Sequence, residues 1–170
     1  MNTKESAKQR LIHALVGIHF SERYYRYYEQ TRHRSPQKFM AHENIAKALV
    51  STGLDFKFDT REKFFYHREK HDAFQISLHV AFTSSAAEFI LAVKTPVGHI
   101  GGPFSLLAEE VALRHDAGFS YSPPYPDPLF SDLQELREVI LFGTSLFEDA
   151  KQAFLEAAGH QSPATALRGN

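Results

Sequence analysis

The sequence predicts an α+β fold: an antiparallel four-stranded sheet, about residues 55–95, with two N-terminal helices and a long C-terminal helix packed on one face. Two observations predict this class. Apolar residues recur with the helical spacing of three to four before residue 53 and after residue 131. Between these regions apolar and polar residues alternate, and the connections are too short for the crossover that parallel strands need.

The N-terminal region predicts two helices. We expect the first to run without interruption from Thr3 to about Arg32, with a bend or a close contact at Gly17. The second is expected to begin with Ser35 as its cap and Pro36 in its first turn, and to end at Gly53. Its expected buried side consists of its apolar residues, Phe39, Ile45, Ala46, Leu49 and Val50.

Four strands are expected in the alternating region. Two short segments, residues 55–59 and 63–68, precede the clearest strand, residues 74–83, and a last strand covers residues 86–95. One side of the clearest strand is wholly apolar and must be covered by helices. Its residues are Phe74, Ile76, Leu78, Val80 and Phe82.

The rest of the chain predicts a loop, two helices and a connecting segment. Residues 96–103 hold three glycines and two prolines, which indicates a loop, and Ser105 can cap a short helix over residues 106–114. The four prolines of residues 117–130 favour an extended segment. The last helix is expected to begin with a capping box in which Ser131 is the cap and Gln134 reaches back to it, and to end at Gly159.

Composition indicates one globular α+β domain, residues 1–159, followed by a flexible tail, residues 160–170. The chain has 170 residues, of which 43% are hydrophobic and 23% charged. Because it has no cysteine, disulfides, thiolate nucleophiles and zinc sites with sulfur ligands are excluded. No apolar run is long enough to span a membrane, and the polar start is unlike a signal peptide, so we expect a cytoplasmic protein without membrane contact.

Charge is unevenly distributed along the chain. Residues 1–70 contain fourteen Lys and Arg against eight Asp and Glu, whereas residues 71–170 contain five against twelve. Such a difference can steer a charged partner, or the two halves can attract each other within one fold. The sequence leaves both interpretations open.

No complete catalytic motif is present, and no cofactor or metal is expected. The Gly-x-Ser-x-Gly nucleophile elbow and the phosphate-binding glycine loop are absent, and His67 and His71 are not expected to converge. One alternative remains, a small hydrolase-like enzyme with a His/carboxylate site near residues 96–103. Its candidate groups are His99 as acid and base, His79, and His115 or Asp116.

Binding residues are easier to nominate, because arginine and tyrosine are enriched at interaction hot spots. The candidates lie in the Tyr/Arg stretch 23–34, in the proline-rich segment and on the last helix: Arg23, Tyr24, Tyr25, Arg26, Tyr28, Tyr121, Tyr125, Glu135 and Glu138. The main hypothesis is a non-catalytic protein-binding module of undetermined oligomeric state. Its profile, without an identifying motif, resembles that of bacterial immunity proteins, which neutralise a cognate toxin by masking its active site. An RNA or single-strand binder that uses residues 23–34 is a further alternative, although the sequence pI of about 6.8 argues against nucleic acid.

Overall fold

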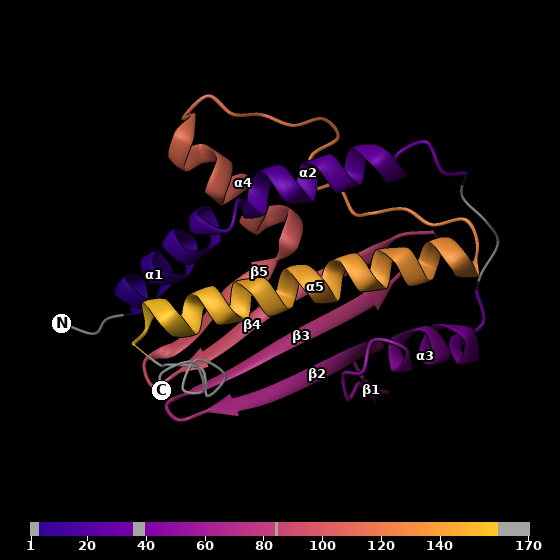
Figure 1. The fold of residues 1–170 in the computed structure, drawn as a ribbon, viewed down its shortest axis with the longest axis horizontal. Coiled ribbons are helices and arrows are strands. Elements are labelled where there is room, and N and C mark those ends of the chain that lie inside the picture. Colours follow the sequence, from indigo (N-terminus) through magenta and orange to yellow (C-terminus); the bar gives the residue numbers. More distant parts are fainter. Residues whose placement is uncertain (1–3, 36–39, 84, 160–170) are drawn as a thin grey trace, which may run out of the picture.

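A computed structural model describes residues 4–35, 40–83 and 85–159 and shows an α+β fold (Figure 1). In the described part, a five-stranded antiparallel sheet with the strand order β1-β2-β3-β4-β5 is accompanied by five helices. The strands are β1 (Lys57–Asp59), β2 (Phe64–His71), β3 (Phe74–Phe82), β4 (Ala87–Thr95) and β5 (Gly98–Pro103). The helices are α1 (Lys4–Gly17), α2 (Phe20–Thr31), α3 (His42–Val50), α4 (Phe104–His115) and α5 (Leu133–Ala157).

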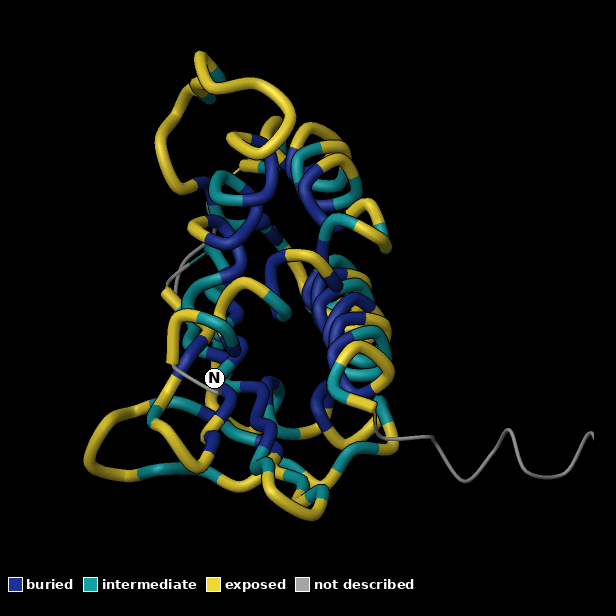
Figure 2. The backbone as a smooth tube through the Cα atoms, turned by 90° about the vertical axis from the view of Figure 1, so that its left-hand side faces the viewer, coloured by how far each residue is buried: buried dark blue, intermediate teal, exposed yellow. Residues whose placement is uncertain are grey.

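The long helix α5 runs across one face of the sheet, and the buried parts of both lie toward the interior (Figures 1 and 2). This inner face carries the apolar row predicted for β3, of which Ile76, Leu78 and Val80 are completely buried. The ring of Phe154 meets Phe74 edge-on with centroids 5.3 Å apart. The predicted covering of this row by a helix is therefore confirmed.

The predicted single N-terminal helix is wrong, because it is broken into α1 and α2. The break falls at Ile18 and His19, and His19 adopts the left-handed conformation with φ 55°. Gly17 itself ends α1 and does not have a positive φ. After the break α2 packs against α4 while α1 packs against α5, so the two segments follow different partners.

The second predicted helix is shorter than expected. It begins at His42 with Ala41 at the cap position, whereas Ser35 lies outside the helix. Val50, expected on the buried side, is 75% exposed. The expected roles of Pro36 and Phe39 fall outside the described residues.

The sheet extends from residue 57 to residue 103, beyond the predicted limit of 95, because the expected loop 96–103 contains β5. Gly101 explains how a glycine-rich segment can pair with β4. Its φ is +106°, and a β-carbon there would lie 3.0 Å from the carbonyl carbon of Leu91 and closer still to the carbonyl oxygen. Only glycine allows the two strands to approach so closely.

The segment between α4 and α5 is extended only in its second part. Ala87 donates its N–H to the carbonyl of Pro128 at 3.1 Å, and Phe130 donates to Ser85 at 2.9 Å, so residues 128–130 lie beside the start of β4. Residues 117–125 instead form the bent, largely exposed loop at the top of Figures 1 and 2. Tyr125, with φ 50°, departs from the expected extended conformation.

The cap of α5 is shifted by one residue from the prediction. Asp132 is the N-cap and accepts the N–H of Glu135 at 2.8 Å, while the Glu135 carboxylate accepts the N–H of Ser131 at 2.8 Å. Gln134 bonds to Glu138 instead. Two carboxylates at a helix N-terminus also complement the helix dipole, which a serine and a glutamine do not.

Two expectations about the limits of the domain remain. The flexible tail predicted for residues 160–170 falls outside the described residues. In the described ranges, no helix combines the length and the apolar character needed to cross a membrane.

Candidate functional site

Several residues predicted to contact a partner have partners within the chain. Arg23 forms an ion pair with Asp149 at 2.6 Å. Tyr24 is completely buried, and its hydroxyl donates to the carbonyl of Pro126 at 2.7 Å. Tyr28 is only 7% exposed. These three side chains attach α2 to α5 and to the proline-rich segment.

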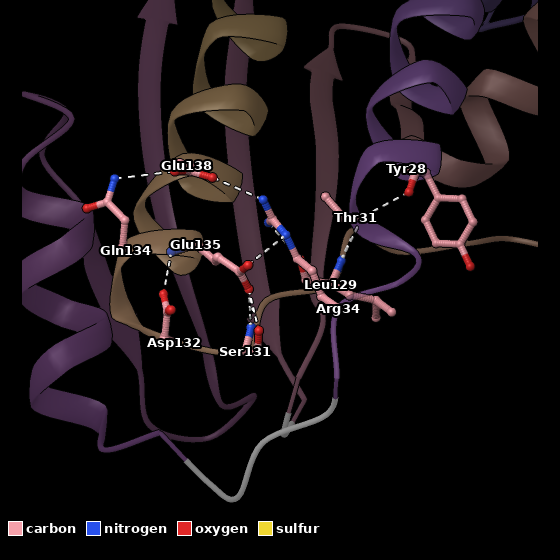
Figure 3. Close-up of polar contacts among 9 residues, drawn as sticks. All are labelled: Tyr28, Thr31, Arg34, Leu129, Ser131, Asp132, Gln134, Glu135 and Glu138. Atoms are coloured by element: carbon pink, nitrogen blue, oxygen red, sulfur yellow. Dashed lines mark hydrogen bonds and ion pairs between the residues drawn. The ribbon is translucent and has the colours of Figure 1, made fainter.

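The two acidic candidates on α5 are ion-paired as well (Figure 3). Arg34 approaches Glu135 at 3.3 Å and Glu138 at 3.0 Å, and it donates to the carbonyl of Leu129 at 3.1 Å. Thr31 accepts the N–H of Leu129 at 3.1 Å. This network joins the end of α2 to the start of α5.

These ion pairs account for part of the uneven charge along the sequence. Lys8 pairs with Glu110, Arg23 with Asp149, and Arg34 with the two glutamates of α5. Each pair joins a cation of the basic N-terminal part to a carboxylate of the acidic C-terminal part. The structure therefore supports attraction between the two halves within one fold.

The three remaining tyrosine candidates lie close together, although the sequence presents them in two separate segments, and Arg26 follows one of them in α2. We call this area the tyrosine surface and define it by Tyr25, Arg26, Phe119, Tyr121 and Tyr125. The rings of Tyr25 and Tyr121 are stacked with centroids 4.2 Å apart, and Phe119 lies 5.3 Å from Tyr25. Tyr125 is 55% exposed and Arg26 is exposed, so both are accessible to a partner.

Tyr25 and Tyr121 of this surface remain neutral at physiological pH. Burial, together with the charges of Glu109 and Tyr125, raises the pKa of Tyr25 to about 12. Burial and a hydrogen bond to Glu29 raise the pKa of Tyr121 to about 12. Each ring therefore offers an apolar face and a hydroxyl group that can donate.

Asp127 belongs to the proline-rich segment between α4 and α5, and its carboxyl group lies next to the buried Tyr24 of α2. Burial, together with the charge of Glu88, raises the pKa of Asp127 to about 7, although a hydrogen bond with Tyr24 lowers it. The protonation of Asp127 is therefore linked to the stability of the segment that carries the tyrosine surface.

A second polar cluster lies between β2 and α5, where His67 and His71 do converge, contrary to the prediction. Both imidazoles meet the carboxylate of Glu69, at 2.8 and 2.9 Å, and Lys151 donates to it at 2.8 Å. Burial alone would raise the pKa of Glu69, but the hydrogen bonds from Lys151 and His67 outweigh burial and lower it to about 2. The period of two in a strand places residues 67, 69 and 71 on one side, so the sequence contained this signal.

His67 has acceptors at both ring nitrogens, because Nδ1 lies 3.1 Å from the carbonyl oxygen of Asp55. The cluster ties α5 to β2, because the polar groups of Lys151, His67 and His71 all converge on the carboxylate of Glu69.

The groups nominated for the hydrolase alternative are far apart. The strand register places His99 level with Gln75, two strands and four residues from His79, a separation of roughly 16 Å. His115 and Asp116 lie at the C-terminal end of α4. Among the described residues, no group of three or more histidine, aspartate or glutamate side chains is arranged to hold a metal ion.

Comparison of the chain with models of protein families, with curated proteins and with solved structures finds no match.

Proposed function

We propose that the protein is a non-catalytic protein-binding module that contacts its partner through the tyrosine surface. The observation that carries the proposal is the convergence of two segments: Tyr25 of α2 meets Tyr121 and Tyr125 of the proline-rich segment, and the exposed Arg26 follows Tyr25 in α2. Tyrosine and arginine together form the composition most enriched at binding hot spots.

The internal packing of this surface favours binding. Tyr25 and Tyr121 are held by stacking, and Glu29 fixes the hydroxyl group of Tyr121. Side chains that are already ordered lose little conformational entropy when a partner binds. Tyr125 and Arg26 extend this ordered base toward solvent.

The finer proposal is an immunity-type protein that acts in the cytoplasm and neutralises a cognate toxin by masking its active site. In this proposal the tyrosine surface covers the toxin. The acidic residues of α5 are a poor choice for this role, because Glu135, Glu138 and Asp149 already neutralise arginines of the same chain.

The proposal is tested by capturing a stoichiometric partner from lysate of the source cells with the immobilised full-length chain. The double variant Arg26→Ala/Tyr125→Ala should weaken capture at least about tenfold, the effect expected for hot-spot residues. The matched control is Arg137→Ala/Leu141→Ala, which removes one exposed cation and one exposed apolar side chain from α5 and should retain capture.

Equal retention of the partner by both double variants would contradict the proposal, as would the absence of any stoichiometric partner. The immunity role is tested separately by co-expressing the chain with the captured partner. Rescue of growth by the wild type and not by Arg26→Ala/Tyr125→Ala supports it, whereas a harmless partner argues against it.

A further inference from the structure

The face of the sheet opposite α5 has a composition unlike the inner face. The strand pairing aligns Lys57, Tyr66, His79 and Ile90 in one row across β1 to β4. We call this side the open face, because no described helix crosses the side of Tyr66 and His79. The helices contact β3 and β4 through inner-face residues such as Phe74. Tyr66, His79 and Ile90 are only partly buried.

Planar side chains lie next to each other on the open face. The ring of Phe64 is stacked on His79, with centroids 4.6 Å apart and an interplanar angle of 8°. Tyr66 lies 6.2 Å from Phe64, and the guanidinium of Arg68 lies 5.0 Å from the centre of the Tyr66 ring. Burial, with the charge of Arg68, lowers the pKa of His79, which keeps this ring neutral.

Four exposed cations surround these rings. Lys57, Arg68, Lys70 and Lys94 form no ion pair with any described residue, in contrast to the arginines that attach the helices. Residues two apart in a strand are about 6.7 Å from each other and neighbouring strands about 4.8 Å. Lys57 and Arg68 are therefore direct neighbours of Tyr66, whereas Lys70 and Lys94 lie about 13–16 Å further along the strands, about the length of two nucleotides of an extended strand.

One carboxylate, Asp72, lines the same surface pocket as Lys70 and Lys94, and two others lie at the opposite end of the face. Asp59 pairs with Phe64 in the strand register, and its side chain accepts the N–H groups of Arg61 and Glu62 at 2.9 Å. Glu88 is opposite Ala81. At this end of the open face Arg68, Lys70 and Lys94 outnumber Asp72, although the net charge of the protein is only −1.

We propose that the open face binds single-stranded nucleic acid, with unpaired bases stacked on Tyr66 and on the Phe64–His79 pair and phosphates bound by Lys57, Arg68, Lys70 and Lys94. Stacked aromatic rings in a cationic groove are the general means of binding unpaired strands. A duplex hides its base faces, and the aspartate and glutamate side chains of an acidic protein segment have no aromatic ring to stack on these rings. This inference does not depend on the tyrosine surface, which other residues form.

The test is fluorescence anisotropy with the full-length chain and a labelled oligouridine of about 12 nucleotides, within the usual range of site sizes. We expect saturable binding that Tyr66→Ala weakens by about 5- to 100-fold and that Tyr66→Phe preserves. The association constant falls as salt rises, and Arg68→Gln/Lys94→Gln should make this fall less steep. The slope of its logarithm against log salt should become less negative by about 0.7 for each phosphate that the variant no longer neutralises. The control Arg114→Gln/Arg137→Gln removes two exposed cations from the helices and should change neither quantity.

Two competitors complete the experiment, a duplex of the same length and a polyglutamate peptide. Saturable binding of the single strand alone supports the inference. Absence of saturable single-strand binding, equal affinity of Tyr66→Ala and the wild type, or equally tight binding of the duplex or the peptide would overturn it. If Tyr66→Ala does not fold by circular dichroism, the exposed pair Arg68→Gln/Lys94→Gln decides the outcome against its control.

Discussion

Gly143 in the middle of α5 provides a demanding test of how the helix packs on the sheet. A β-carbon at this position would lie 2.6 Å from Cδ1 of Phe89 and closer to two further atoms of that ring. Phe89 is completely buried and packs 5.6 Å from the ring of Phe104, so it has little room to move. An alanine normally stabilises a helix interior by about 1 kcal/mol relative to glycine.

Gly143→Ala should nevertheless destabilise the protein. Overpacking a filled core costs about 1–3 kcal/mol and more where the neighbour cannot shift, which exceeds the helical gain. We expect a net loss of about 1–2 kcal/mol in the free energy of unfolding, measured by equilibrium urea denaturation. Gly17→Ala is the control, because nothing lies within 4 Å of its β-carbon position, and it should be neutral or stabilising.

A smaller side chain at Phe89 should relieve the clash. In the cycle formed by Gly143→Ala and Phe89→Leu, the double variant should lose less stability than the sum of the single losses, by about 1 kcal/mol. Gly143→Ala as stable as the wild type would refute the reasoning, because α5 would then lie farther from β4 than described.

Three further predictions concern polar groups. The raised pKa of Asp127 means that the folded state holds its proton longer, so stability should fall as pH rises from about 4 to about 7; Asp127→Asn should remove about 2 kcal/mol of this fall in urea titrations at several pH values. Because the pKa of Glu69 is lowered to about 2, the ionised carboxylate stabilises the fold above about pH 4.5, and this stabilisation is lost as the pH falls toward 2. Glu69→Gln should therefore lower the free energy of unfolding by about 1–2 kcal/mol at pH 7 and leave it unchanged at pH 2, by the same assay. Arg34→Gln should lower the midpoint of thermal unfolding by a few degrees, and the exposed Arg137→Gln should not. Parallel pH profiles of variant and wild type in the first two cases, or equal midpoints in the third, would contradict these assignments.

Local patterning was enough to predict the elements whose side chains alternate or repeat strongly. The apolar row of β3 and the presence of a long C-terminal helix follow from the period alone, whereas the cap of that helix lies one residue after the predicted Ser131. The fifth strand did not, because glycine and proline in residues 98–103 are typical of loops. The strand forms because β4 offers a partner whose backbone only Gly101 can approach.

The break at Ile18 and His19 depends on tertiary contacts in the same way. The apolar spacing of residues 11–25 is compatible with one helix, and only the separate packing of α1 on α5 and of α2 on α4 separates the two segments. The periodicity of a helix does not show which distant segments of the chain the helix will pack against.

The tyrosine surface shows what sequence reasoning can and cannot provide for a site. Residue type nominated Tyr25, Arg26, Tyr121 and Tyr125, but the meeting of Tyr25 with Tyr121 and Tyr125 requires the loop after α4 to fold over α2. Conversely, Arg23, Glu135 and Glu138 have the residue types of a binding surface and are used for internal ion pairs. A linear count of charges cannot distinguish these two uses.

The claim that helices cover one face of the sheet and leave the other open is tested most directly by methyl NMR with a soluble paramagnetic chelate. Ile90 and Leu91 are adjacent in β4 and point to opposite faces, Ile90 to the open face and Leu91, only 1% exposed, to α5. The chelate should broaden the methyl signals of Ile90 strongly and leave those of Leu91 almost unchanged. Equal broadening of both, or protection of Ile90, would contradict the arrangement and remove the basis for the open face.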